Sequence, residues 1–160
     1  MFNLIKTIGK KRSPVFIKQK FYKQNFHIMK TDLGRVVILV NDYDEAFEFY
    51  KENFNCKKFF DITQFDGKRY LHISFGGESR AGLWFIKAET EEQKNLVGKQ
   101  TAGMPLLVMY TDSLEEMTES FSEKGVKFKT EPIITDDYMS VHVYDLYGNE
   151  IVFVQLLPGE

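Results

Sequence analysis

One order of predicted elements occurs twice along this chain: a strand, a helix and then three strands. The first copy covers residues 34–88 and the second covers residues 104–157, so the order repeats with a period of about 70 residues. One copy alone leaves a face of its sheet uncovered. Two copies can form a curved mixed sheet around a cavity with the helices on its outer face, and we therefore expect an α+β fold of two βαβββ modules.

The start of the first copy shows how these elements are inferred from the residues. Residues 36–40 are a continuous apolar run, which is typical of a buried strand. Asp42 or Asp44 can then accept hydrogen bonds from the free amides of a helix whose apolar face includes Phe47 and Tyr50. Three further strands complete this copy, and they are predicted at residues 57–63, 69–75 and 82–88.

The second copy follows a charged, glycine-containing connector at residues 89–103. Its first strand is predicted at residues 105–110 and its helix at residues 114–124, with Gly125 as the C-terminal cap. Pro132 stops or bends the first of the three strands that follow. These strands are predicted at residues 126–130, 138–145 and 150–156.

Charge is distributed unevenly along the chain. Residues 1–33 form a basic N-terminal extension, since residues 1–30 hold eight of the 21 Lys and Arg residues and no acid. The acidic remainder, residues 34–160, is unlike a nucleic-acid-binding domain. The extension is either a poorly ordered or docked segment or an arm that contacts a membrane surface or a partner protein. No apolar run approaches the length of about 20 residues that a membrane-spanning helix needs.

Cysteine usage limits both the compartment and the chemistry. Cys56 is the only cysteine, so the chain cannot form an intrachain disulfide. This fits a reducing compartment, and we expect a cytoplasmic protein. We expect the Cys56 thiol to be partly buried and inert, since no Ser or Cys lies in a recognisable nucleophile motif.

Three segments, in this order and spacing, resemble the vicinal oxygen chelate superfamily, which includes glyoxalase I, bleomycin resistance proteins, fosfomycin-modifying enzymes and extradiol dioxygenases. VILVNDYDEAFEFY resembles the opening strand, aspartate turn and helix of these proteins. LLVMYTDSLEEMTESFSEKGVKF resembles the same unit in their second module. DLYGNEIVFVQ resembles their closing turn and last strand, with Leu146 and Tyr147 in place of the usual Pro and Asp. The resemblance covers residues 35–157.

The resemblance also implies where a metal would bind. Metal-using relatives carry His or Glu at four positions that face the cavity. The corresponding residues here are Arg35, Trp84, a residue within 104–106, and Val152. Protonated arginine cannot act as a ligand, and tryptophan and valine have no ligand atom. We therefore expect no cofactor, with a divalent metal possible only if the ligands are relocated to His72, His142 and Glu150.

Alternation along the strands predicts which side chains face the cavity. The ligand-binding candidates chosen in this way are Arg35, Tyr70, His72, Trp84, Ser140, His142, Tyr144 and Glu150. Aromatic walls with a few polar groups are typical of small-molecule sites. The polar candidates also have structural interpretations, with the histidines as hydrogen-bonded strand residues, Glu150 as a solvated charge and Arg35 as a side chain that reaches solvent.

These residues favour a metal-free protein that binds a small aromatic or anionic molecule, in the manner of the bleomycin resistance proteins. The first alternative is an enzyme of the superfamily, such as a lyase, dioxygenase, epimerase or thiol transferase, with relocated ligands or with metal-free acid–base chemistry. The second is a dimeric scaffold whose basic arm docks to a membrane or partner. The resemblance further implies a homodimer, with or without exchange of modules. We expect no nucleic-acid partner and no integral membrane segment.

Overall fold

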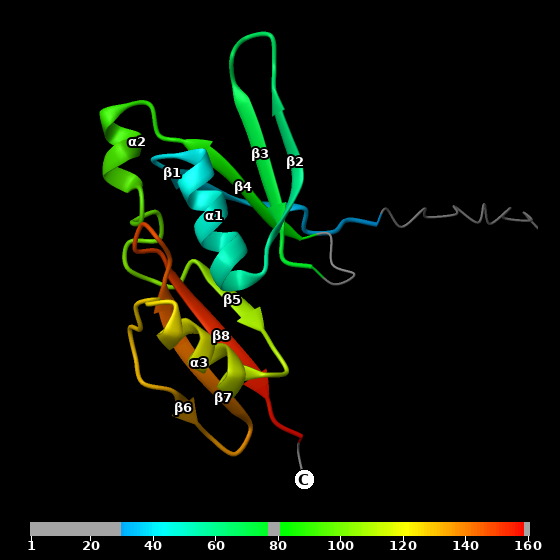
Figure 1. Ribbon diagram of the computed structural model, residues 1–160, viewed down its shortest axis with the longest axis vertical. Coiled ribbons are helices and arrows are strands. Elements are labelled where there is room, and N and C mark those ends of the chain that lie inside the picture. Colours follow the sequence, from blue (N-terminus) through cyan, green and yellow to red (C-terminus); the bar gives the residue numbers. More distant parts are fainter. Residues whose placement is uncertain (1–29, 77–80, 159–160) are drawn as a thin grey trace, which may run out of the picture. The chain divides into compact units, whose positions relative to one another are not determined.

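The computed structural model describes residues 30–76 and 81–158, and its helices and strands lie within one compact unit, residues 32–160 (Figure 1). Predictions for residues 1–29, most of the expected basic extension, lie outside the described residues. In chain order the elements are β1 (Arg35–Val40), α1 (Tyr43–Phe54), β2 (Lys57–Thr63), β3 (Arg69–Ser74), β4 (Gly82–Lys87), α2 (Glu91–Leu96), β5 (Leu107–Tyr110), α3 (Leu114–Glu123), β6 (Ile133–Ile134), β7 (Tyr138–Tyr144) and β8 (Glu150–Leu156).

The strands form two four-stranded mixed sheets, one from each module. The strand order is β1-β4-β3-β2 in the first sheet and β5-β8-β7-β6 in the second. In each sheet the first strand of the module pairs in parallel with the last one, and the other neighbours are antiparallel. The predicted α+β fold is confirmed, although the described strands make two sheets that do not close on each other.

The first helix, α1, begins and ends where the residues favour it. Asp42 is the N-cap, and its Oδ1 accepts from the backbone N of Asp44 at 2.9 Å and of Glu45 at 3.2 Å. The helix ends at Asn55, whose φ of 53° is left-handed. The buried side chains on its apolar face are Ala46, Phe47, Tyr50 and Phe54.

The second long helix, α3, also buries an apolar face, which includes Leu114 and Phe121. Its N-cap Ser113 makes no side-chain capping bond, and the backbone N of Leu114 donates instead to Oε1 of Gln155 in β8, at 2.8 Å. Gly125 follows the helix with a φ of 73°, which a residue with a Cβ adopts only with strain. The helix is therefore fastened to its own sheet at its first turn.

The predicted connector contains a short helix. α2 begins with a capping box in which the Thr90 side chain accepts from the backbone N of Gln93, and Gln93 in turn accepts from the backbone N of Thr90. Further along, Oε1 of Gln100 accepts from the backbone N of Leu39 at 2.7 Å. This segment therefore satisfies a backbone donor at the edge of the first sheet.

Residues 126–130, which were predicted as a strand, are not one in the structure. Only Phe128 pairs, in an isolated bridge to Val143, and β6 further along has two residues. Pro132 has no N–H to donate to a ladder and stands directly before β6. The prediction was therefore wrong about the strand, although it placed the interruption correctly.

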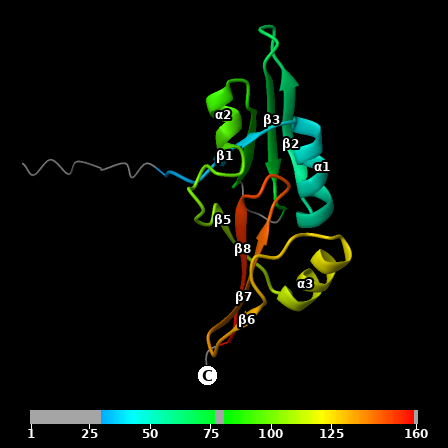
Figure 2. The ribbon, with the colours of Figure 1, turned by 90° about the vertical axis from the view of Figure 1, so that its left-hand side faces the viewer.

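The two modules share one core. The Phe54 ring of α1 lies 5.6 Å from the Phe121 ring of α3 and 5.4 Å from the Phe153 ring of β8. The buried Tyr50 hydroxyl donates to Oδ2 of Asp145 at 2.8 Å, which joins α1 to the turn after β7. Figure 2 shows α1 and α3 on the same side of the strands.

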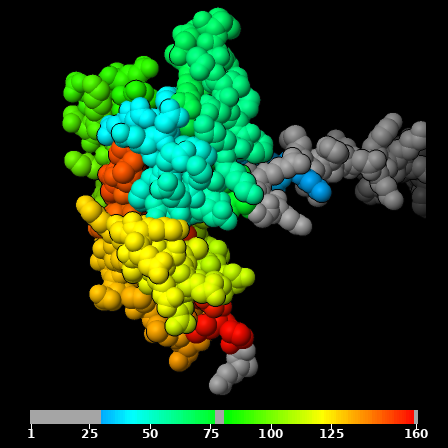
Figure 3. Space-filling view, in the orientation of Figure 1, coloured from blue at the N-terminus to red at the C-terminus, as the bar shows by residue number. Residues whose placement is uncertain are grey.

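The turn between β7 and β8 also contacts the start of α1. The Tyr147 hydroxyl accepts from the backbone N of Asp42 and donates to its carbonyl, each at 3.1 Å. In the space-filling view the orange turn lies against the cyan residues of α1 (Figure 3). These contacts fix the second module against the first, so each sheet presents its remaining face in a defined position.

Each sheet has one face under its long helix, α1 or α3, and an opposite face that carries no long helix, which we call the open face. The open face of the first sheet carries Arg35, Val37, Phe60, Tyr70, His72, Trp84 and Ile86. The open face of the second sheet carries Val108, Tyr110, Ser140, His142, Tyr144, Glu150, Val152 and Val154. Within residues 30–76 and 81–158, the helices are too short and too polar to cross a membrane.

Candidate ligand-binding site

A row of aromatic side chains crosses the open face of the first sheet. The register places Val37 opposite Trp84, Trp84 opposite His72, and His72 opposite Phe60. The His72 ring lies 5.2 Å from the Trp84 ring and 5.4 Å from the Phe60 ring. The Tyr70 ring stacks on Trp84 at 5.9 Å with an interplanar angle of 26°. Such a surface offers flat ring faces to a ligand.

A cavity of about 400 Å³ lies at one end of this row. β3 pairs with β4 only as far as Leu71 and Phe85, while the hairpin of β2 and β3 continues beyond that point. The cavity occupies the resulting fork, where Tyr70 and Trp84 provide aromatic walls. Its other lining side chains include Ile86, Lys68, Lys87, Glu89 and Gln93. This volume lies in the range of small-molecule sites.

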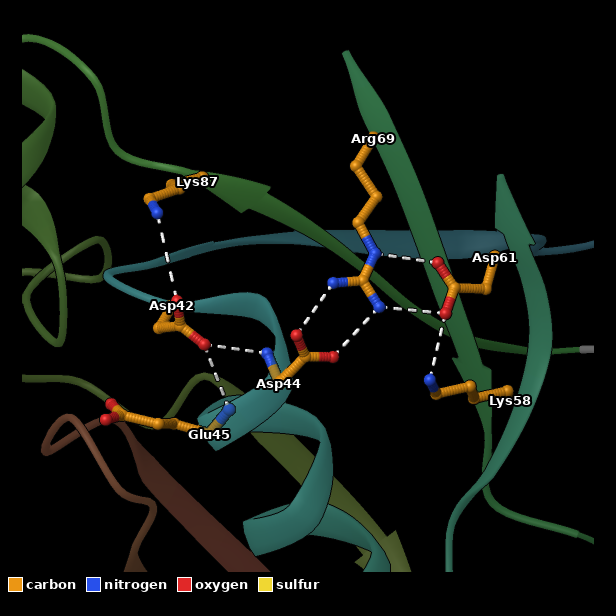
Figure 4. A network of polar contacts seen from close by, with 7 residues as sticks. All are labelled: Asp42, Asp44, Glu45, Lys58, Asp61, Arg69 and Lys87. Carbon is orange, nitrogen blue, oxygen red and sulfur yellow. Dashed lines mark hydrogen bonds and ion pairs between the residues drawn. The ribbon is translucent and has the colours of Figure 1, made fainter. Parts of the chain in front are cut away.

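Arg69 fastens the hairpin wall of the cavity to α1 (Figure 4). Its Nη1 and Nη2 donate to the Asp44 carboxylate at 3.0 and 2.9 Å, and its Nε and Nη2 donate to the Asp61 carboxylate at 2.8 and 2.9 Å. Lys58 also donates to Asp61, at 2.9 Å. The Arg69 hydrogen bonds, followed by the Lys58 bond, hold the pKa of Asp61 well below its usual range.

The Tyr43 side chain of α1 closes the same end of the cavity. Its hydroxyl donates to the backbone O of Arg69 at 3.0 Å, and the Arg69 guanidinium lies 5.5 Å from the centre of its ring. Tyr43 itself lines the cavity. Because Tyr70 directly follows Arg69, these contacts also set the position of the aromatic wall.

Two polar candidates lie on this face beside the aromatic row. The Arg35 guanidinium lies 4.3 Å from the centre of the Phe59 ring, and its Nη1 donates to the backbone O of Gly34. The His72 Nε2 is buried without a hydrogen-bond partner among the described residues. Burial, followed by the charge of Arg35, lowers the pKa of His72 and favours the neutral ring.

The second sheet holds a different group of candidates. Glu150 is only 4% exposed, so the alternative of a solvated strand-end charge is wrong for this residue. Its Oε1 lies 2.6 Å from Nδ1 of His142, and its Oε2 accepts from Nζ of Lys129. Burial alone would raise the pKa of Glu150, but the bonds to Lys129 and His142 outweigh it and lower the pKa. Tyr144 lies opposite Glu150 in the strand register. Ser140 lies opposite Val154, and its side chain is buried.

The structure therefore divides the eight candidates between two faces. Arg35, Tyr70, His72 and Trp84 lie on the first sheet, and Ser140, His142, Tyr144 and Glu150 lie on the second. Sequence reasoning missed Lys129 and Phe60. A β-bulge between Lys58 and Phe60 shifts the alternation in β2, and Lys129 lies in an irregular segment. The local aromatic pair Phe59-Phe60 was the only sequence signal for Phe60.

The positions that bind metal in relatives do not fit a divalent ion in this chain. Arg35 begins β1, Trp84 lies among aromatic rings in β4, and Val152 is paired with Val108 and His142 in β8. Leu106, just before β5, donates its backbone N to the backbone O of Glu150 and has no ligand side chain. Within the described ranges, His, Cys, Asp and Glu side chains form no group of three that could hold a metal, so His72 does not join His142 and Glu150 in a relocated site.

The duplicated βαβββ modules and their open faces define the class of protein. Residues 32–153 match the family model described as the Glyoxalase/Bleomycin resistance protein/Dioxygenase superfamily. The chain belongs to this superfamily, and the resemblance inferred from the three sequence segments is confirmed. Membership gives the fold, while what this chain binds depends on the open faces described above.

Among its relatives is an uncharacterized protein of Shewanella frigidimarina, which is 32% identical over 130 residues, or 80% of this chain and 96% of that protein. The crystal structure of UcmS2 has a TM-score of 0.68 at 22% identity and covers 79% of this chain and 98% of its own. The structure of TnmS3, an antibiotic binding protein from Streptomyces sp. CB03234, has a TM-score of 0.66 at 20% identity and covers 82% and 100%. At these identities the two structures show the shared fold.

Proposed function

We propose that this chain is a binding protein that holds a small aromatic molecule, including an anionic one, against the open face of the first sheet without a divalent metal. The observation that carries the proposal is the aromatic row that ends in the cavity between Tyr70 and Trp84. A planar ligand in the fork would contact both rings. Each aromatic contact of this kind contributes about 0.5–1.5 kcal/mol beyond the burial of apolar area.

Charge around the cavity supports an anionic group on the ligand. Lys68 and Lys87 line it together with Glu89, and the ammonium of Lys87 lies 3.8 Å from the Asp42 carboxylate. Arg69 also lines the cavity, but four of its five N–H donors already serve Asp44 and Asp61. The two lysines are therefore the groups we expect to meet a sulfonate or carboxylate.

The shared fold of TnmS3 gives independent support at the level of architecture. That protein is an antibiotic binding protein, and 82% of this chain superimposes on all of it. A binding role without chemistry is therefore compatible with two βαβββ modules in this arrangement. The inference to this chain rests on the fold and not on shared residues, because the identity is 20%.

Thermal unfolding with and without anilinonaphthalene sulfonate, in the presence of EDTA, tests the proposal. A ligand present at about 100 times its Kd stabilises the folded state by about 2.7 kcal/mol, so we expect the Tm to rise. Trp84→Leu should reduce the Tm shift. Phe65→Leu, which removes an exposed ring at the tip of the β2–β3 hairpin, should not. A shift that appears only after a divalent metal is added would refute the metal-free site.

We also propose that a second copy of the chain packs against part of the open faces, at their exposed apolar side chains, and leaves the cavity and His142 accessible to ligand. Large apolar side chains are exposed on both of them, including Phe60 at 41% on the first sheet and Val108 at 57% and Tyr110 at 71% on the second. Exposed apolar side chains that gather on a surface often mark a site of protein–protein contact. A homodimer would bury this area and leave the cavity at its edge. Light scattering on the purified chain should give twice the mass of one copy.

A reducing compartment, such as the cytoplasm, is part of the same proposal. Cys56 is a free and buried thiol, and 3% of its surface is exposed. A small domain without disulfides is typical of reducing compartments. Cell fractionation with an antibody against the native protein tests the location, and recovery in a secreted fraction would contradict it.

A further inference from the structure

The two histidines described in the strands occupy equivalent places in the repeated register but have different partners. In the first sheet, Trp84 lies between His72 and Val37. In the second sheet, Val152 lies in the same way between His142 and Val108. Only the histidine of the second sheet has a buried carboxylate against its ring, since Nδ1 of His142 lies 2.6 Å from Oε1 of Glu150. The cluster of His142, Glu150 and Lys129 therefore requires its own explanation.

The protonation of Glu150 determines which nitrogen of His142 is available. The lowered pKa of Glu150 keeps it ionised near neutral pH, and an ionised carboxylate can only accept hydrogen bonds. Nδ1 of His142 must then carry a proton and donate it to Oε1. In the neutral ring, Nε2 is left as an acceptor with a free lone pair.

The Glu150 carboxylate has two partners in this cluster, the Lys129 ammonium and the His142 ring. The His142 side chain is 25% exposed on the open face, whereas Glu150 is 4% exposed beneath it. The other titratable group near the cluster is Tyr144, whose charge interacts with Lys129. A buried carboxylate that orients an accessible imidazole is the usual arrangement of a proton acceptor.

We propose that Nε2 of His142 accepts the proton of a weakly acidic hydroxyl, such as that of a phenol or an enol, when a ligand binds the open face of the second sheet. The ligand O–H bond breaks, the Nε2–H bond forms, and the electron pair stays on the ligand oxygen, so a neutral pair becomes imidazolium and oxyanion. Glu150 is the positioning residue, because it holds Nδ1–H and stabilises the imidazolium. This goes beyond the proposed function, because it adds a second binding surface on the other sheet and names the ionisable group of the ligand bound there.

Para-nitrophenol is a suitable probe because its phenolate absorbs visible light and its phenol does not. Titration with the full chain, at a pH near the ionisation of the free probe, where an ordinary imidazole is mostly neutral, should increase the phenolate absorbance until it saturates with protein concentration. His142→Gln should reduce the phenolate fraction of the bound probe by at least about tenfold, which corresponds to one unit of acidity. Lys127→Gln, a change at an exposed residue in the same segment, should leave it unchanged.

A measurement on the wild-type chain covers the case in which His142→Gln does not fold. With ¹⁵N-labelled histidine, one ring nitrogen should change from an unprotonated to a protonated chemical shift as para-nitrophenol is added, and this change should belong to Nε2 of His142. Absence of phenolate absorbance, or phenolate that persists in folded His142→Gln, would overturn the inference. If the probe changes the emission of Trp84 but stays protonated, the inference fails while the proposed binding on the first sheet survives.

Discussion

The Tyr50 hydroxyl joins the two modules through a buried charge. It donates to Oδ2 of Asp145, which also accepts from Nδ2 of Asn149 at 2.8 Å, while Oδ1 accepts from the backbone N of Tyr147 and of Asn149. Burial, followed by the charge of Asp145, raises the pKa of Tyr50 far above its usual range, so its proton stays in place.

Tyr50→Phe should lower the free energy of unfolding by about 2 kcal/mol, because it removes a hydrogen bond to a charged acceptor and leaves part of the Asp145 carboxylate unsatisfied. Chemical denaturation measures the change. Tyr110→Phe is the matched control, since Tyr110 is 71% exposed and the change should stay within about 0.5 kcal/mol. Equal effects of the two variants would show that the contact does not join the modules.

Cys56 gives a second prediction for a single residue. Burial raises the pKa of its thiol to about 12, so at pH 8 about one molecule in ten thousand carries the reactive thiolate. We expect iodoacetamide to modify the folded protein far more slowly than the urea-unfolded protein, with a rate that increases with pH up to the alkaline limit of folding. Rapid labelling of the folded protein at pH 7 would contradict the buried, inert thiol.

Among the elements, the hairpin of β2 and β3 depends on Arg69 for its position against α1. The hydrogen bonds from Arg69 lower the pKa values of Asp44 and Asp61. Their ion pairs therefore stabilise the fold fully above the usual aspartate pKa of 3.8, and this stabilisation is lost as the pH falls below that value. Arg69→Met should cost about 1 kcal/mol at neutral pH, where the pairs are partly exposed, and should flatten the acid dependence of stability.

Hydrogen exchange measures the same prediction at the level of the hairpin. The amides of β2 and of β3 before Leu71 should exchange faster in Arg69→Met, while those of β4 should not change. Lys51→Met is the control, because Lys51 makes an exposed pair with Glu48 and a contact with the Phe47 ring, both within α1. If the hairpin amides keep their protection, Arg69 does not hold the cavity wall.

The elements also show which features a sequence can predict. Asp42 and the apolar stripe that follows predict α1 because capping and periodicity are local, and regular alternation in β3 predicts that Tyr70 and His72 share a face. The bulge that turns Phe60 onto that face and the bond from Lys129 to Glu150 depend on contacts between distant residues. Local patterns therefore located the strands of the site but not its complete set of side chains.

At the scale of the whole molecule, the uncovered open faces predict a dimer that depends on apolar contacts. Tyr110→Asp places a charge on the open face of the second sheet and should shift the protein toward monomer, because the charge would lose its water in the interface. Glu119→Lys, on an exposed position of α3, should leave the mass unchanged. Light scattering at several concentrations distinguishes these outcomes, and a dimer unaffected by Tyr110→Asp would place its interface elsewhere.

Metal-free binding beside Trp84, the only tryptophan in the chain, is the central feature proposed for this molecule. Titration of EDTA-treated protein with anilinonaphthalene sulfonate, followed through tryptophan emission, reports directly on that position. We predict saturable quenching that does not change when divalent metals are added and that is weaker in Tyr70→Leu. Emission that stays constant throughout the titration, or that responds only after a metal is added, would contradict the proposed site.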